Sequence, residues 1–215
     1  MRPLPISVAV VILALSPVAL AQGRFFLGAT GGVSRTSLSG DAPDKASYTS
    51  RTGFSVGLTG EYALTDDIRL CVQPMFARRG TGVAFDVGEE DPRDSLELTL
   101  DYVTTSVMAR FMSPKGAWFV NGGLDCGFLL DASMRDVNAG GTVDVKEFVN
   151  GLDLMMILGA GAVVDVSPAF LTFEIRYSQG LLNIGANNGL ATAAGMPVRF
   201  RSSGFQLLAG VLFPL

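Results

Sequence analysis

The chain ends in the stretch Phe205-Gln206-Leu207-Leu208-Ala209-Gly210-Val211-Leu212-Phe213. Its odd-numbered residues are all apolar, whereas the even-numbered ones form a more mixed set. Alternation with a period of two is the pattern of a β-strand. An apolar outer face combined with a mixed inner face is what a strand of a transmembrane β-barrel needs. The stretch therefore predicts the closing strand of such a barrel.

Seven further stretches alternate in a similar way, so that the chain predicts eight strands. They are Phe25–Arg35, Gly53–Leu64, Ile68–Arg79, Leu96–Met112, Ala117–Leu130, Leu152–Val164, Phe170–Leu182 and the final strand Arg199–Phe213. In the fourth, the alternation changes phase near Tyr102-Val103, which predicts a β-bulge at that point. A ten-stranded count stays open, with an extra hairpin in Gly80–Ser95 or Asp131–Gly151.

The connections between these strands alternate in length. Short turns follow the second, fourth and sixth strands. Long polar or glycine-rich segments follow the other strands, at Ser37–Thr52, Gly80–Ser95, Asp131–Gly151 and Asn183–Val198. Short turns at one end and long loops at the other are typical of barrels of the bacterial outer membrane, whose long loops are extracellular. We therefore predict an all-β fold, an eight-stranded antiparallel up-and-down transmembrane β-barrel.

The first residues of the chain predict export. A short basic segment, Met1-Arg2-Pro3, precedes the apolar stretch Ile6–Leu15, and Ala19-Leu20-Ala21 is a small-x-small cleavage site. The apolar stretch is shorter than the roughly 20 residues that span a bilayer. We interpret residues 1–21 as a cleavable signal peptide and residues 22–215 as one outer-membrane β-barrel domain.

Composition agrees with this location and excludes several functions. Hydrophobic residues make up 48% of the chain, yet no run beyond the signal is long enough for a helical span. Acidic residues outnumber basic ones by 20 to 16, which argues against a nucleic-acid partner. The chain has no histidine, so that a serine nucleophile lacks its usual base and a zinc or copper site lacks its usual ligands. We expect neither catalysis nor a cofactor or metal.

Acidic residues in the second long loop leave one catalytic alternative open. Glu89-Glu90-Asp91 and Asp94 could form an acid–base pair. The acids from Asp86 to Asp94 could bind Ca²⁺ through oxygen ligands, although solvated surface charge is the simpler interpretation of both. The two cysteines lie in different strand patterns, Cys71 on the inward face and Cys126 on the outward face. Because side chains that point apart cannot be bridged, we expect no disulfide.

The predicted inward faces carry many charged and polar residues of both signs. An eight-stranded barrel has an interior that its own side chains fill, and an unpaired buried ion is costly. We therefore expect a lumen charge network that closes the barrel as a plug, with a conducting path as the alternative. Its predicted members are Glu61, Arg69, Gln73, Arg110, Asp125, Asp153, Glu174 and Arg176.

Two regions of the sequence resemble a known family. One runs from Leu100-Asp101-Tyr102-Val103 through Ala109-Arg110-Phe111 to Lys115-Gly116-Ala117-Trp118-Phe119-Val120-Asn121-Gly122-Gly123. The other comprises Gly159-Ala160-Gly161 and Phe173-Glu174-Ile175-Arg176-Tyr177-Ser178-Gln179-Gly180-Leu181-Leu182-Asn183-Ile184. Both are similar to strands of the outer-membrane β-barrel domain of the PorT type. The resemblance implies an eight-stranded outer-membrane barrel, and some members look like accessories of a protein-secretion system.

Three functions remain open from the sequence. The first is a non-enzymatic outer-membrane barrel with a plugged lumen, whose long loops recognise a ligand, an envelope protein or a secretion assembly. The second is a narrow, porin-like channel. The third is a soluble periplasmic binding barrel, which the charged inner and apolar outer faces oppose. For the first two we expect outer-membrane lipid and the outer-membrane assembly machinery as partners. The loops expected to contact envelope or secretion proteins are residues 37–52, 80–95, 131–151 and 183–198.

Overall fold

The computed structural model describes residues 25–40, 46–85, 94–137, 140–183 and 200–215. The predicted signal peptide, residues 1–21, lies outside them. The described chain is built from β1 (Phe25–Gly40), β2 (Ala46–Ala63), β3 (Ile68–Phe85), β4 (Asp94–Met112), β5 (Trp118–Asp136), β6 (Thr142–Asp144), the one-turn 3₁₀-helix η1 (Lys146–Phe148), β7 (Leu152–Asp165), β8 (Phe170–Gly180) and β9 (Phe200–Pro214).

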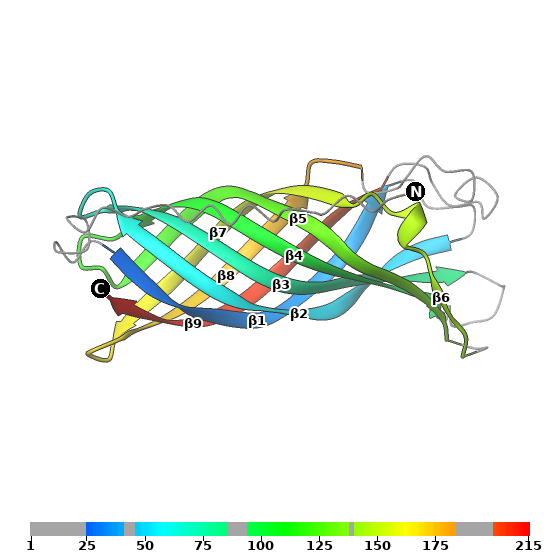
Figure 1. Cartoon of the computed structure of the whole chain (residues 1–215), viewed down its shortest axis with the longest axis horizontal. Helices are drawn as coiled ribbons and strands as arrows, with labels where there is room; N and C mark the ends of the chain where they lie inside the picture. Colours follow the sequence, from blue (N-terminus) through cyan, green and yellow to red (C-terminus); the bar gives the residue numbers. More distant parts are fainter. Residues whose placement is uncertain (1–24, 41–45, 86–93, 138–139, 184–199) are drawn as a thin grey trace, which may run out of the picture.

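Eight of these strands form a closed antiparallel barrel (Figure 1). Each wall strand pairs with the next one along the chain, and β1 pairs with β9 from Phe26↔Pro214 to Gly40↔Phe200 to close the ring. The short β6 pairs with β5 alone, beyond the start of β7. It therefore adds nothing to the wall, and within the described residues the ten-stranded alternative is wrong.

The two ends of the barrel differ. The end with short connections, here the turn end, holds residues 64–67, 113–117 and 166–169 and also both ends of the described chain, where the Leu215 N–H donates to the Phe25 carbonyl. The opposite end, here the loop end, is reached by strands longer than predicted. Every described residue of the stretches expected as loops 37–52 and 80–95 is strand, because β1 keeps pairing with β9 up to Gly40↔Phe200 and β2 keeps pairing with β3 up to Ala46↔Phe85.

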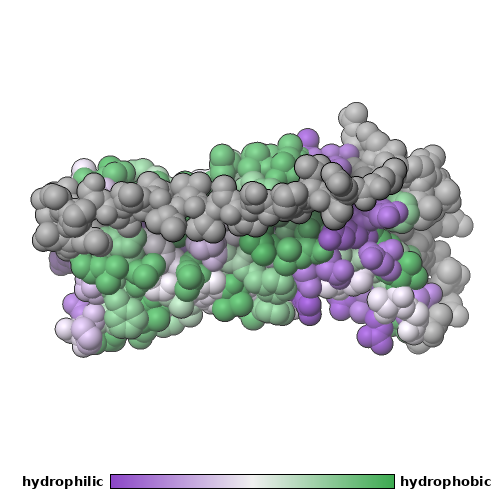
Figure 2. Space-filling view, in the orientation of Figure 1, coloured by the Kyte–Doolittle hydropathy of each residue, from purple (hydrophilic) through white to green (hydrophobic). Residues whose placement is uncertain are grey.

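A belt of outward apolar side chains surrounds the barrel. Leu58, Phe128 and Leu207 are 57–58% exposed, which is expensive in water but favourable in lipid. Figure 2 shows this apolar surface giving way to a hydrophilic band toward the loop end. Among the described residues no helix is long and apolar enough to cross a membrane.

A register shift lies next to Tyr102, where a β-bulge is expected, but the side chains of the fourth strand do not change face there. Even-numbered residues of β4 point inward over its whole length, from Leu98 and Leu100 to Arg110. What changes near Tyr102 is the hydropathy of the two faces of β4. Toward the loop end its inward side chains are apolar and its outward ones are polar. Within the belt its outward side chains are mostly apolar and its inward ones are mostly polar. The register shift belongs to the partner strand, where Asp101 faces Asp131 and Tyr102 faces Leu129, so that Leu130 is the extra residue.

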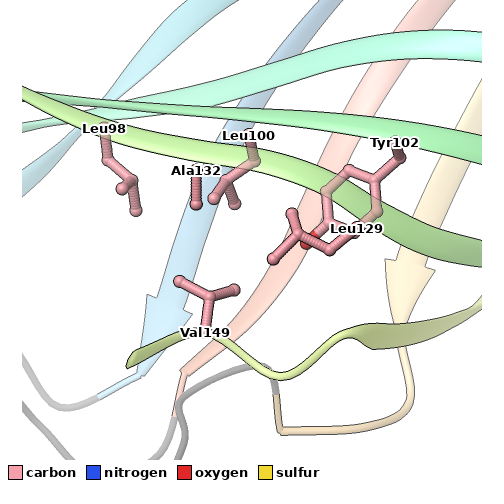
Figure 3. Packing of buried hydrophobic residues seen from close by; sticks show 6 residues of the cluster. All are labelled: Leu98, Leu100, Tyr102, Leu129, Ala132 and Val149. Atoms are coloured by element: carbon pink, nitrogen blue, oxygen red, sulfur yellow. The ribbon is translucent and has the colours of Figure 1, made fainter. Parts of the chain in front are cut away.

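The inward apolar residues at the loop end form a small core of their own, here called the apolar cap (Figure 3). It comprises Leu98, Leu100, Tyr102, Leu129, Ala132 and Val149, with Met134 and Val145 packed against it. The segment between β6 and β7 returns across β4 and β5, and Val149 faces the other five side chains (Figure 3). The Val145 N–H donates to the Ala132 carbonyl and fixes this segment to β5.

Closure of the barrel depends on close approach between β1 and β9. We predict that Gly32→Ala destabilises the barrel by about 1–3 kcal/mol, because a Cβ at this position would lie 1.9 Å from the Leu207 carbonyl oxygen. The measurement is the compact, heat-sensitive gel band after refolding in detergent. Gly60→Ala is the matched control, since its Cβ would meet nothing closer than 3.9 Å. Equal refolding of the two variants would contradict the prediction.

Candidate functional site

The lumen is the part of the barrel where chemically active groups gather. Seven of the eight residues predicted for its charge network are buried and point inward from six strands. The eighth, Arg69, lies near the turn end with 19% of its side chain exposed. Their positions follow from the period of the strands, because every second residue of a barrel strand points into the lumen.

Arg110 on β4 is the centre of the first group, here called the Arg110 cluster. Its Nη2 lies 3.0 Å from Glu174 Oε2 on β8, and its Nη1 forms an ion pair with Glu61 on β2. Because β2, β4 and β8 are not neighbours in the wall, both contacts cross the lumen. The guanidinium also lies over the ring of the buried Phe119, 3.9 Å from its centroid.

Three further side chains complete the Arg110 cluster. Arg69 Nη1 lies 3.2 Å from the second oxygen of Glu61. Arg176 donates through Nε to Glu174 Oε1 at 2.7 Å and through Nη2 to the Gln73 side-chain oxygen at 2.7 Å. Gln73 in turn donates to the Thr59 hydroxyl. The cluster thus holds three arginines and two glutamates, with most of their polar atoms paired.

A second group, the Arg79 cluster, lies further along the lumen. Arg79 on β3 donates to Asp125 Oδ2 at 2.7 Å and to Asp153 Oδ2 at 3.0 Å. Asp125 and Asp153 belong to β5 and β7, so that this group also crosses the lumen. The Ser106 hydroxyl donates to the other oxygen of Asp125 at 2.6 Å.

Arg79 is 5% exposed and is not among the residues predicted for the lumen. A signal for it was present, because Arg79 has the same odd numbering as Arg69, Cys71 and Gln73 on the same strand. It lies at the end of the predicted strand, next to Arg78, which points outward. With β3 continuing to Phe85, the alternation extends past Arg79 and carries it into the lumen.

The two clusters balance each other in charge. The Arg110 cluster has one arginine more than it has carboxylates, and the Arg79 cluster has one carboxylate more than it has arginines. Together they contain four arginines and four carboxylates. This neutrality reduces the cost of burying so many ions in a narrow interior, and the opposite excesses attract each other along the barrel axis.

A small cavity separates the clusters and is lined by side chains of both, among them Arg79, Asp125 and Arg176. It offers about 10 Å³ to the centre of a water molecule, which is about the room that one bound water needs. The buried Ser55 hydroxyl also lines it and has no protein partner. At this level the lumen is therefore filled by side chains, with space for about one water.

The remaining predicted residues carry no site of their own. Cys71 is buried against Met108 and Ile157, Cys126 lies half-buried, and both thiols are free. Glu89-Glu90-Asp91 lie outside the described residues, as does the Asp94 side chain. In the part of the chain that the structure describes, no three cysteine or acidic side chains gather in a way that could hold a metal ion.

We predict that Arg110→Ala lowers the free energy of unfolding by about 3–5 kcal/mol, because Glu61 and Glu174 each lose one of two arginine partners and the lumen keeps one buried carboxylate more than it has arginines. The measurement is urea-induced unfolding of the refolded barrel in detergent micelles. Arg135→Ala removes an exposed arginine at the loop end and is expected to change the value by no more than about 0.5 kcal/mol. An unchanged midpoint for Arg110→Ala would contradict the assigned role of the cluster.

Several solved structures of outer-membrane proteins are similar to this chain. The closed barrel resembles Ail, the attachment invasion locus protein of Yersinia pestis (16% identity, 88% of this chain and 99% of that one, TM-score 0.48). It also resembles Neisserial surface protein A (16%, 89% and 97%, TM-score 0.47) and OprG of Pseudomonas aeruginosa (12%, 89% and 96%, TM-score 0.42). At this level of similarity the three structures carry nothing about what this chain binds. No curated protein matches the sequence.

A family model gives the stronger result. The outer membrane protein beta-barrel domain matches residues 20–185, which include seven of the eight wall strands and every member of both clusters. The family model does not distinguish the PorT type from other members of the family. The resemblance to the PorT type therefore stays a prediction. With its closed antiparallel wall, apolar belt and paired lumen charges, the chain belongs to the outer membrane protein beta-barrel domain family and resides in the bacterial outer membrane.

Proposed function

We propose that this protein is a non-enzymatic, non-conducting outer-membrane barrel that acts through recognition at its extracellular end. In the orientation of bacterial outer-membrane barrels, short turns face the periplasm and the opposite end faces the outside. The turn end is then periplasmic and the loop end extracellular. The single observation that carries the proposal is the neutral set of arginines and carboxylates whose ion pairs cross the lumen.

Three layers support a lumen that passes no hydrated ions. The Arg110 cluster and the Arg79 cluster each connect strands on different sides of the barrel, and the apolar cap lies beyond them. An ion that passed would have to break paired contacts and then cross an apolar layer, where it loses its hydration at a large cost. Charged residues in a lumen could also line a porin-like channel, and a conductance measurement distinguishes this alternative from a closed lumen.

The extracellular end supplies the surface for recognition. β4 and β5 extend beyond the belt, and the apolar cap stabilises this extension from inside. Binding residues are commonly found on loops that a rigid scaffold positions. β6 sits on this scaffold with all three of its residues exposed, including Val143 at 64%. A ligand, an envelope protein or a secretion assembly would find an ordered surface there, and the PorT resemblance favours a role as an accessory of such an assembly.

Conductance separates the two functions. We expect the wild-type barrel to give no stable single-channel current in planar bilayers, because both clusters block the lumen. The triple variant Arg79→Ala, Arg110→Ala and Val149→Ala removes the centre of each cluster and opens the apolar cap, and it is expected to give measurable current. Compact gel mobility before heating controls for folding of both proteins. Steady current through the wild-type barrel would overturn the plug and favour the channel.

Crosslinking in living cells tests recognition at the extracellular end. A photoreactive residue at Val143 is expected to yield a discrete protein adduct, because this exposed position lies on the extension beyond the belt. Leu207 is the control, since it is similarly exposed at 57% but lies within the belt, where only lipid adducts are expected. The absence of a protein adduct at Val143, with lipid adducts at Leu207, would contradict recognition through this surface.

A further inference from the structure

Arg35 on β1 is the first charged residue beyond the apolar belt on its strand. Val33, two residues earlier on the same outward face, is 52% exposed and belongs to the belt. Arg35 is exposed, and its neighbour across the β1–β9 pair is Phe205, which is 57% exposed. Phe205 contacts the ring of Tyr177 at 5.1 Å between centroids. Aromatic side chains gather where a barrel passes from hydrocarbon to headgroups, so that Arg35 lies at the headgroup level of the outer leaflet.

The charge of Arg35 has no carboxylate partner in the described part of the chain, unlike that of two neighbouring arginines. Arg78 on β3 forms two hydrogen bonds of 2.7 Å with Asp101. Arg51 on β2 lies 2.6 Å from Glu97. Arg35 instead donates through Nε to the Ser50 hydroxyl at 2.7 Å. Among the described residues, therefore, the two terminal nitrogens of Arg35 have no partner and can donate to a bound group.

The groups around Arg35 are donors. The Ser50 hydroxyl accepts from Arg35 Nε and so has its own proton to donate. Thr52 is exposed on β2 and lies directly opposite Arg35 in the β1–β2 register. One guanidinium and two hydroxyls thus lie exposed on the outer face of β1 and β2. Such an arrangement fits a phosphate, which only accepts hydrogen bonds when fully ionised and which arginine binds with two parallel bonds.

We propose that Arg35, Ser50 and Thr52 form a binding site for the phosphate of an anionic lipid in the outer leaflet. The location of the site at the belt edge identifies the lipid as the source of the phosphate, because a headgroup is held at this level by its own acyl chains. The site is independent of the lumen plug and of recognition at β6. It would fix the depth and the lipid surroundings of the β1–β2 side of the barrel.

Lipid A that carries phosphates is the probe for this site, titrated into the refolded full chain in detergent and followed by native mass spectrometry. Arg35→Gln is expected to weaken binding about fivefold, since one basic residue near an anionic surface contributes about this much. Arg135→Gln removes the same charge from an exposed position further from the belt and is expected to change binding less than about twofold. Removal of the phosphates from lipid A is expected to weaken its binding to the wild type at least as much as Arg35→Gln weakens the binding of phosphorylated lipid A.

Three results would overturn the proposal. Equal affinity of the wild type and Arg35→Gln would remove Arg35 from the site. An equal loss in Arg35→Gln and Arg135→Gln would show a general effect of net charge. Displacement of lipid A by millimolar inorganic phosphate would show that Arg35, Ser50 and Thr52 bind a soluble anion and not a lipid headgroup. Compact gel mobility before heating shows that each variant is folded, and Arg35 is exposed, so that its replacement leaves the barrel intact.

Discussion

Closure of the backbone hydrogen-bond ladder is the constraint on which the rest of this structure depends. In hydrocarbon no water can satisfy a free N–H or C=O group, so that a sheet can cross a membrane only if its two edges pair. Here β1 and β9 meet that condition along almost their whole length. The two glycines Gly28 and Gly32 allow the strands to approach, because a Cβ at either position would clash with the carbonyl oxygen of β9.

Once the ring is closed, the small number of strands determines what the lumen can contain. Eight strands leave an interior about as wide as the side chains that fill it, and alternation sends every second residue there. Charged residues in that space must find partners across the lumen. Arg110 and Arg79 each meet two carboxylates from non-neighbouring strands. The ion pairs therefore connect strands two or three places apart in the ring, which adds to the pairing between neighbouring strands.

The edge of the belt divides the barrel into two chemical regimes. Within lipid the outside is apolar and the inside is charged, whereas beyond it β4 and β5 have a polar outside and an apolar inside. The extension of β4 and β5 thus buries apolar side chains and exposes polar ones, as a protein in water does, although it consists of the same strands that cross the membrane. Arg78, Arg51 and Arg35 all lie near this transition. Two are neutralised by Asp101 and Glu97, and the third faces the leaflet with donors around it.

The sequence alone determined the strands, their order along the chain and the inward direction of Glu61, Arg110 and Asp125, because a period of two is a local property of the backbone. The tertiary structure decided which charges meet, since pairing across the lumen depends on the stagger of strands distant in sequence. It also brought Arg79 into the lumen, which required β3 to continue past its predicted end. The hydropathy pattern of β4 changes at Tyr102 because lipid ends near this level, and a sequence does not show where lipid ends. Only the closed barrel places that boundary, and with it the inside of β4 changes from charged to apolar.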